Sequence, residues 1–448
     1  MSTPLAARRV AFDVLRQVTA EDAYANLALA RHLADARLDT RDAAFATELV
    51  AGTCRLIGSY DAIITRAGGR ELKTLQPAVV DLLRLLAHQA LSMNIPLRAA
   101  VSSTVELARA TVGQRVTGIV NAIGRRIGAK DMGDWITELS LGQDDLGRLA
   151  VRFHHPRWII ESYGELLPAA EVPTALAANN EPPRPTLVIR PGLATVEELS
   201  PATPTRYSPY GAVLDGAPAA ITAVREGRAG VQDEGSQLVA LALARAEAPT
   251  GPWLDLCAGP GGKAALLAGF ARLAGDQLVA NEVAEHRARL VQQALAAYPE
   301  GTASVLCSDG RQPNEVRQLG PFSRVMVDAP CSGLGALRRR PESRWRRVPE
   351  DLADLVPLQL ALLRSAISLA APGGVVAYAT CSPHAQETRE VVMKVMTSHP
   401  GLELLNAPSL LPEVPDGAAG KFLQLWPHRH STDAMFLALL RVRQARPT

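Results

Sequence analysis

Hydrophobic residues in the first third of the chain recur at helical spacing. They do so in four segments between residue 6 and about residue 130, namely ARRVAFDVLRQV, FATELVAGTCRLIGSYDAII, VVDLLRLLAHQAL and VTGIVNAIGRRI. Helix-breaking residues bound these segments at Gly68, Gly69, Pro77, Pro96 and Gly113. Apolar positions three and four residues apart, with breaks of this kind, are typical of a bundle of amphipathic helices. The pattern therefore predicts an all-helical domain over residues 1–135.

The pattern changes twice more along the chain. Over residues 140–229 the helix-like FHHPRWIIESYGELL is followed by a proline-rich stretch and the strand-like TLVIR, which predicts a small mixed α/β module. Over residues 230–445 amphipathic segments alternate with the β-branched runs WLDLC, LVANEV, SVLCSD, RVMVDAP and VVAYATC. This alternation predicts an α/β fold with a doubly wound parallel sheet. Two last runs, KFLQLWP and DAMFLALLRV, predict an antiparallel edge hairpin.

The composition narrows the class of protein. The chain has 448 residues, of which 47% are hydrophobic and 21% charged, so it is long enough for several domains and too apolar for wholesale disorder. No apolar run approaches the roughly 20 residues of a membrane span, and the start MSTPLAARRV has no signal-peptide core. We therefore expect a cytoplasmic protein without a membrane partner. The net charge of +2 allows a polyanionic partner but does not favour one.

The cysteines argue against a disulfide framework and against structural zinc. They are odd in number and include no Cys-x-x-Cys pair, at positions Cys54, Cys257, Cys307, Cys331 and Cys381. We expect free thiols, a reducing compartment and no bound metal. His154 and His155 are adjacent but lack the spacing of further metal ligands, so we assign them no role.

Three predicted strands end in residues suited to a nucleoside. In a doubly wound sheet ligands bind beyond the carboxyl ends of the strands. The first strand is followed by a loop whose glycines let the backbone approach a ligand, made of Ala258, Gly259, Pro260, Gly261, Gly262 and Lys263. This loop lacks the spacing of a dinucleotide fingerprint and the ending of a phosphate loop, so neither NAD nor ATP is favoured. Glu282 ends the second strand, where it could bind ribose hydroxyls, and Asp309 ends the third, where it could bind an adenine amino group.

Two cysteines end the next two strands. The fourth strand places Asp328 and Cys331 at its carboxyl end, and the fifth places Cys381 there. Because neighbouring parallel strands end at the same edge of a sheet, we expect both thiols and the aspartate to face one cleft. A thiol beside an acid is typical of covalent catalysis.

These motifs together resemble a known family. DLCAGPGGK, SDGR, VDAPCSGLG and YATCSP are similar to the Sun/Nop family of RNA 5-methylcytosine methyltransferases, and residues 1–135 resemble the NusB-like RNA-binding domain of its bacterial Sun/Fmu (RsmB-like) 16S rRNA members. The resemblance implies a Rossmann-like class I methyltransferase sheet, the cofactor S-adenosylmethionine and a 16S rRNA substrate. It implies that the cofactor site is lined by Cys257 to Lys263, Glu282, Arg287, Asp309 and Asp328. It also identifies VQDEGSQLVA, residues 231–240, as the motif that precedes the sheet.

The chemistry of such an enzyme needs both thiols. Carbon 5 of cytosine is a poor nucleophile, so a thiolate must first add to carbon 6, helped by an acid at ring nitrogen 3, which suits Asp328. A base must later remove the carbon-5 proton. The chemistry alone does not say which cysteine attacks, whereas the resemblance assigns attack to Cys381 and product release to Cys331. Two alternatives stay open: methylation of tRNA or another RNA, and a ribosome-assembly factor that binds RNA without catalysis.

The sequence departs from the family in three places. The glycine loop has AGPGG where AAPGG is common, and the ribose acid Glu282 stands where aspartate is usual. Both departures preserve the chemistry. The chain also has Asp433-Ala434-Met435-Phe436 where an aromatic pair often follows the aspartate, which leaves the role of the C-terminal hairpin open.

A basic segment follows the Cys331 motif. LRRRPESRWRR contains Arg338, Arg339, Arg340, Arg344, Trp345, Arg346 and Arg347. Arginines around an aromatic residue suit phosphate contacts and stacking on bases, so we expect this segment to bind RNA. The target base must leave its stack to reach a thiol, which favours single-stranded or looped RNA. We expect a monomer.

Overall fold

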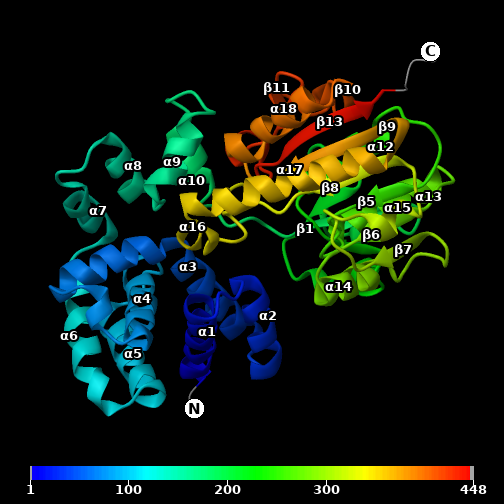
Figure 1. The fold of residues 1–448 in the computed structure, drawn as a ribbon. Helices are drawn as coiled ribbons and strands as arrows, with labels where there is room; N and C mark the ends of the chain where they lie inside the picture. The colour runs from blue at the N-terminus through cyan, green and yellow to red at the C-terminus, as the bar shows by residue number, and fades with distance from the viewer. Residues whose placement is uncertain (1–2, 444–448) are drawn as a thin grey trace. The chain divides into compact units, whose positions relative to one another are not determined.

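The chain forms two compact units, which are described separately (Figure 1). The computed structural model describes residues 3–443, so the predicted domain end at residue 445 lies outside the described residues. The helical unit consists of Met1–Asn180 together with Leu337–Arg347, and the sheet unit consists of Glu181–Ala336 together with Val348–Thr448.

The helical unit begins with the predicted bundle. Its first six helices are α1 (Thr3–Ala20), α2 (Ala25–Ala36), α3 (Thr40–Gly68), α4 (Pro77–Leu91), α5 (Leu97–Thr111) and α6 (Thr117–Ile127). The Asp39 side chain caps α3 by accepting from the Asp42 N–H, and Gly69 ends that helix in the left-handed conformation, with φ of 62°. Pro77 is the first residue of α4, where its missing N–H leaves no helical hydrogen bond unmade. The helix ends predicted from glycine and proline therefore agree with the structure.

Four more helices and one distant segment complete this unit. They are α7 (Met132–Ser140), α8 (Asp145–Phe153), α9 (Arg157–Gly164), α10 (Val172–Ala178) and, from the basic segment, α16 (Ser343–Arg346). The small module predicted over residues 140–229 is therefore divided, because its first helices, up to α10, belong to the helical unit and its strands belong to the sheet unit. The segment 337–347 also interrupts the predicted continuous domain over residues 230–445.

The sheet unit contains a small sheet and a large one. The small sheet is antiparallel, in the order β2-β3-β1-β4. Its strands are β1 (Thr186–Ile189), β2 (Thr203–Pro204), β3 (Gly211–Val213) and β4 (Ala229–Val231), and the short α11 (Thr222–Arg225) precedes β4.

The large sheet has the order β11-β12-β13-β9-β8-β5-β6-β7, and β10 pairs with β13. Its strands are β5 (Trp253–Asp255), β6 (Leu278–Asn281), β7 (Ala303–Leu306), β8 (Phe322–Asp328), β9 (Ala370–Thr380), β10 (Leu402–Leu404), β11 (Ala418–Ala419), β12 (Phe422–Gln424) and β13 (Phe436–Val442). Five neighbouring strands pair in parallel, in the order β9-β8-β5-β6-β7. The strand order reverses between β5 and β8, which is where ligands bind in doubly wound sheets.

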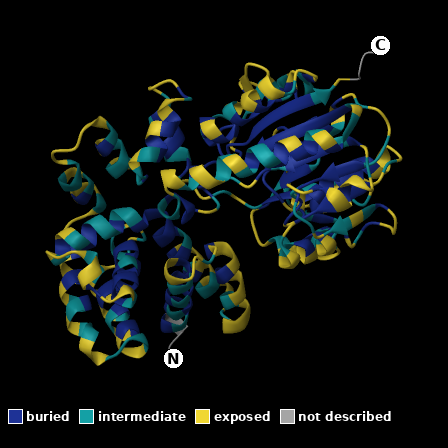
Figure 2. Ribbon diagram, in the orientation of Figure 1, coloured by how far each residue is buried: buried dark blue, intermediate teal, exposed yellow. Residues whose placement is uncertain are grey.

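Helices cover both faces of the large sheet, whose strands are mostly buried (Figure 2). They are α12 (Glu234–Arg245), α13 (Gly262–Leu273), α14 (Glu285–Leu295), α15 (Asn314–Arg317), α17 (Leu352–Leu369), α18 (Arg389–Ser398) and α19 (Pro427–His430). Side chains of α12 and α13 pack in one apolar core, and those of α17 and α18 pack in a second. The doubly wound α/β fold is confirmed. The C-terminal hairpin also forms, but β13 lies inside the sheet between β9 and β12.

Within residues 3–443, one helical stretch has the length and composition of a membrane span. It is Pro349–Leu369, which corrects the expectation that no apolar run approaches that length. In the structure this stretch contains α17, whose Leu362, Leu363 and Ala366 lie in the core that also contains residues of β8 and β9. An apolar helix of this kind is what a doubly wound sheet needs as cover on one face.

Candidate active site

The glycine loop after β5 is fixed by the acid at the end of β6. Glu282 is 3% exposed, and its carboxylate accepts from the Gly259 N–H at 3.0 Å and from the Ala284 N–H at 3.0 Å. Arg287 donates to the Gly259 carbonyl at 2.6 Å. Gly261 precedes α13 with φ of 110°, and a Cβ atom there would lie 2.6 Å from the Ala294 Cβ. The loop therefore needs glycine for its conformation and for its close packing against α14.

Lys263 joins this loop to β8. Its Nζ atom lies 2.9 Å from the Asp328 carboxylate and 3.2 Å from the Ser236 Oγ. Burial acts to lower the pKa of Lys263, but Asp328 outweighs this effect and the pKa is raised. Ser236 belongs to the predicted motif over residues 231–240, so this motif, the glycine loop and the end of β8 meet at one point.

Asp255, the last residue of β5, was not predicted as a site residue. It is fully buried, and burial, followed by the nearby Asp328, raises its pKa to about 7. Among the described residues, no side chain donates to its carboxylate; the nearby Lys263 charge and the Cys257 N–H act to lower the pKa but do not outweigh burial. An acid as the last residue of a buried strand is the signal that the sequence offered. A buried carboxylate without a side-chain donor, at the point where strand order reverses, fits a ligand that carries a cationic or donor group.

Two other predicted cofactor residues, Asp309 and Cys257, have pKa values that their surroundings shift in opposite directions. Asp309 follows β7, and Arg311 binds its carboxylate at 2.6 Å and holds its pKa below the usual range. Burial raises the pKa of Cys257 well above its usual range, so this thiol stays protonated. Cys257 can line the site but does not provide a thiolate.

The two predicted catalytic thiols lie together. The Cys331 Sγ and Cys381 Sγ atoms are 3.4 Å apart, at the carboxyl ends of β8 and β9. The contact with Cys381, followed by burial, raises the pKa of Cys331 well above its usual range. The contact therefore opposes the simultaneous ionisation of the two thiols. The proximity expected from the positions of the strands is present.

The C-terminal hairpin packs on the two loops that carry Cys331 and Cys381, which we call the Cys331 loop and the Cys381 loop, or together the cysteine loops. The Gly335 N–H donates to the Cys381 carbonyl at 2.8 Å, and the Gly335 carbonyl accepts from the Ala434 N–H at 2.9 Å. The Asp433 N–H donates to the Asp233 carboxylate at 2.9 Å, in the motif that precedes the sheet. The hairpin therefore supports the cysteine loops, which gives a structural role to the segment whose sequence departs from the family.

The basic segment requires a correction. Arg344 is fully buried in the helical unit, where it donates to the His154 carbonyl at 3.1 Å, the Asn179 carbonyl at 3.0 Å and the Asn180 Oδ1 at 2.7 Å. The Trp345 Nε1 donates to the Arg55 carbonyl at 3.1 Å. Arg344 is buried and paired inside the helical unit, which contradicts the expectation that it contacts RNA. Trp345 anchors the segment through its ring nitrogen but is partly exposed, so its contact with RNA stays a prediction.

The other arginines of this segment differ in their contacts and in how far they are exposed. Arg346 donates to the Ala23 carbonyl at 2.8 Å, and Arg338 is 8% exposed, whereas Arg340 is exposed and lies over the Tyr24 ring. Arg339 and Arg347 are partly buried. Arg340 is therefore the arginine of this segment with the most accessible position for a phosphate.

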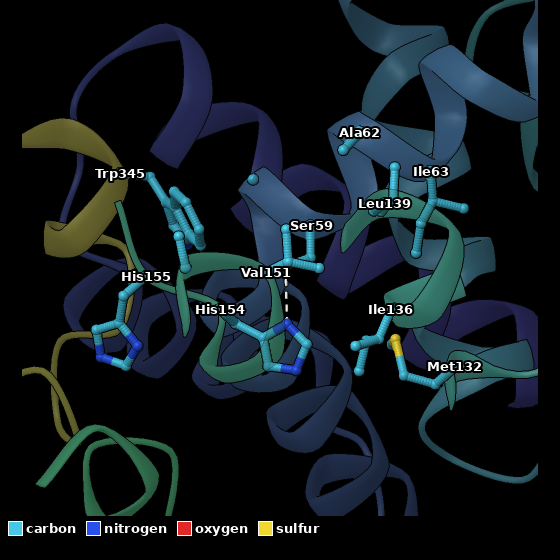
Figure 3. Close-up of a pocket in the computed structure, with 12 residues that line it drawn as sticks. Ser59, Ala62, Ile63, Met132, Ile136, Leu139, Val151, His154, His155 and Trp345 are labelled. Carbon is cyan, nitrogen blue, oxygen red and sulfur yellow. Dashed lines mark hydrogen bonds between the residues drawn. The ribbon is translucent and has the colours of Figure 1, made fainter. Parts of the chain in front are cut away.

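A pocket of about 180 Å³ lies in the helical unit (Figure 3). Its lining is mostly apolar, and its polar side chains are hydrogen-bonded, since the Ser59 Oγ lies 2.8 Å from the His154 Nδ1 and the His155 Nδ1 lies 2.6 Å from the Phe153 carbonyl. Burial lowers the pKa of His154 to about 4, so the ring is neutral. The two histidines are packing residues here, and of the predicted site residues only Trp345 lines this pocket.

Comparison with known proteins identifies the family. Residues 240–441 match the model described as 16S rRNA methyltransferase RsmB/F, and residues 5–128 match the NusB family. The putative methyltransferase Rv1407 of Mycobacterium tuberculosis is 48% identical over 97% of this chain and 96% of that protein. The probable ribosomal RNA small subunit methyltransferase B of Synechocystis is 30% identical over 98% of this chain and 99% of that protein. The chain belongs to the RsmB/F methyltransferase family.

The solved structures agree on the fold. PH0851 matches with a TM-score of 0.82 and 22% identity, over 98% of this chain and 99% of that chain. NSun6 from Pyrococcus horikoshii, solved with SFG, matches with a TM-score of 0.54 and 18% identity, over 65% of this chain and 99% of that chain. The resemblance to the Sun/Nop family with a NusB-like N-terminal domain is confirmed, and so is S-adenosylmethionine as the cofactor. The protein is an S-adenosylmethionine-dependent RNA methyltransferase.

Proposed function

We propose that the protein methylates carbon 5 of a cytosine in 16S rRNA, with Cys381 as nucleophile and Cys331 as the base that allows release. The observation that carries this proposal is the pair of thiols 3.4 Å apart at the ends of two neighbouring strands. One thiol can attack the base while the second is within reach of the same ring. The relatives named as small subunit methyltransferase B support 16S rRNA as the substrate.

The cofactor site fits the residues present. The glycine loop from Cys257 to Lys263, Glu282, Arg287 and Asp309 would hold the nucleoside part of S-adenosylmethionine. The buried carboxylate of Asp255, to which no side chain of the described residues donates, would receive the amino group of its methionine part. When bound, the cofactor supplies the methyl group. Asp328, which Lys263 binds, instead contacts the target cytosine, as hydrogen-bond donor or acceptor at ring nitrogen 3.

The contact between the two thiols fits an ordered reaction. Contact with Cys381, followed by burial, raises the pKa of Cys331, so the pair does not readily lose both protons at once. In the proposal Cys381 ionises first, and its thiolate adds to carbon 6, where its charge is lost in the new carbon–sulfur bond. That charge then no longer opposes the ionisation of Cys331, and Cys331 gives up its proton. Its thiolate removes the proton from methylated carbon 5, and the electron pair of that C–H bond expels Cys381 as a thiolate.

The test uses unmodified small-subunit rRNA, with unmodified tRNA as the rival substrate. We expect 5-methylcytosine in the rRNA, detected by mass spectrometry after nuclease digestion, and none with Cys381→Ala. Cys331→Ala should accumulate a covalent protein–RNA complex visible on a denaturing gel, and Cys307→Ser, which removes an exposed thiol that is not one of the pair, should still release product without accumulating the complex. Product in tRNA alone would transfer the proposal to that substrate. Absence of product from both RNAs would support the alternative that the protein is a ribosome-assembly factor without catalysis. A complex formed through Cys331 would make Cys331 the nucleophile and Cys381 the base.

A further inference from the structure

A buried carboxylate that the mechanism does not use lies behind the two cysteines. Glu387 ends the short helical turn η6 (Ala385–Glu387), six residues after Cys381, and is fully buried. Its carboxylate accepts from the Ser332 N–H at 2.8 Å, from the Ser332 hydroxyl at 2.5 Å and from the Gln359 Nε2 at 3.0 Å. Its own carbonyl accepts from the Tyr378 hydroxyl at 2.7 Å. All its contacts are therefore with residues around the ends of β8 and β9 and with α17.

The network reaches both cysteine loops through the residue that follows each cysteine. Ser332 follows Cys331, Ser382 follows Cys381, and their hydroxyl oxygens are 3.0 Å apart. The Ser382 Oγ accepts from the His384 N–H at 3.2 Å. Because the Ser332 proton is given to the carboxylate, the Ser382 hydroxyl supplies the proton between the two serines. In this series of hydrogen bonds each serine hydroxyl donates once, and the last acceptor is the Glu387 carboxylate.

The two loops depend on this network to different degrees. The Cys331 loop is held on both sides of the cysteine, since Gln359 also donates to the Pro330 carbonyl at 2.9 Å. Cys381 has supports of its own: Thr380 before it pairs with Phe436 in the sheet, and the Thr380 hydroxyl donates to the Ser382 carbonyl at 2.8 Å. Loss of Glu387 should therefore release the Cys331 loop while Cys381 keeps its place.

We infer that Glu387 is a positioning residue that holds the Cys331 loop against Cys381 and so keeps the two thiols at contact distance. The inference rests on the proposed function, in which attack needs Cys381 and release needs Cys331. A carboxylate in this position acts on the second step. Without it, Cys381 still attacks carbon 6, but the base that must reach the carbon-5 proton is displaced.

The experiment compares Glu387→Ala with the wild type in single-turnover reactions on unmodified small-subunit rRNA. Two quantities are measured at each time: covalent protein–RNA complex on a denaturing gel, and released RNA that contains 5-methylcytosine. We expect the ratio of complex to released product to rise about tenfold or more, since a displacement of about 1 Å can cost that much. Ser332→Ala, which removes the hydroxyl link alone, and Glu387→Gln, which keeps one acceptor oxygen, should give intermediate ratios.

The control is Glu342→Gln, which changes a buried carboxylate of the helical unit that accepts from the Ala25 N–H and takes no part in the cysteine network. Its ratio of complex to product should equal that of the wild type, even if less protein folds. A general loss of stability in Glu387→Ala would lower complex and product together, and such an unchanged ratio would overturn the inference. If the wild type makes no 5-methylcytosine, or if Cys381→Ala keeps activity, the proposed function fails instead.

Discussion

Replacing Asp255 by asparagine should change how the stability of the sheet unit depends on pH. Burial, followed by the nearby Asp328, raises the pKa of Asp255 from 3.8 to about 7. At ~1.4 kcal/mol per pH unit, ionising this carboxyl in the folded protein costs about 4 kcal/mol. The folded protein holds a proton that the unfolded chain has already lost. The contribution to stability is thus fully present below pH 3.8 and is lost as the pH rises through about 7.

Asparagine has nearly the same shape and does not ionise. The free energy of unfolding of the wild type, minus that of Asp255→Asn, should therefore fall by ~1.4 kcal/mol per unit between about pH 5 and pH 7 and level off above about pH 8. Because the chain has two units, the measurement should report on one of them. Amide hydrogen exchange in peptides that contain β5 and β6, corrected for the intrinsic effect of pH, gives this local free energy.

The matched control is Asp276→Asn, near the other end of β5, where the carboxylate accepts from the Gly251 N–H at 3.0 Å and is partly exposed. Two outcomes would refute the argument. The first is a difference between wild type and Asp255→Asn that stays constant from pH 5 to pH 8. The second is an equal slope in Asp276→Asn, which would show that the effect does not come from the buried carboxyl.

Three further predictions concern the loop, the cofactor and the basic segment. Gly261→Ala should destabilise the sheet unit by about 1–3 kcal/mol more than Gly275→Ala in urea unfolding. Both glycines have positive φ, but only at Gly261 would the added Cβ atom clash with a neighbouring helix, so equal losses would contradict this reasoning. Glu282→Ala should weaken binding of S-adenosylhomocysteine roughly tenfold to a hundredfold by calorimetry, because it frees the Gly259 N–H as well as removing a ligand; unchanged affinity would exclude both effects. Arg344→Ala should destabilise the helical unit by about 3 kcal/mol or more in hydrogen exchange, whereas Arg340→Ala should leave stability within about 1 kcal/mol and reduce the salt dependence of RNA binding. The reverse pattern would restore the RNA contact first expected for Arg344.

The parts of the fold that local patterns determine could be predicted from the sequence. The bundle, the order of strands and helices and the strand-end positions of Glu282, Asp328 and Cys381 all follow from periodicity and from the rule that parallel strands end together. The division of residues 140–229 could not be predicted in this way. Both of its parts are amphipathic, and which core each one joins depends on contacts far along the chain.

Burial of charged residues was the main obstacle. Glu387 and Asp255 are both fully buried, but only Asp255, as the last residue of a buried strand, carries a signal in the sequence, whereas Glu387 does not differ from an ordinary loop acid. The signal for Glu387 lies in its partners. Each cysteine motif places a serine directly after the cysteine, and a buried carboxylate six residues after the second cysteine can accept from the serine of the first motif. A sequence shows the two serines, but only the structure shows that they share one acceptor.

The basic segment shows why charge density alone misled the prediction. Arg344 lies where α8 and α10 end, and it donates to the carbonyls of His154 and Asn179, which have no partner inside their own helices. Glu342 has the opposite position, with its carboxylate on the N–H of Ala25 at the start of α2. Each charge has the sign that a helix end of that polarity favours. A run of charged residues can therefore serve as the caps of helices from distant parts of the chain. Within this run Arg340 is exposed, with its guanidinium over the ring of Tyr24, and is the arginine best placed to reach a phosphate.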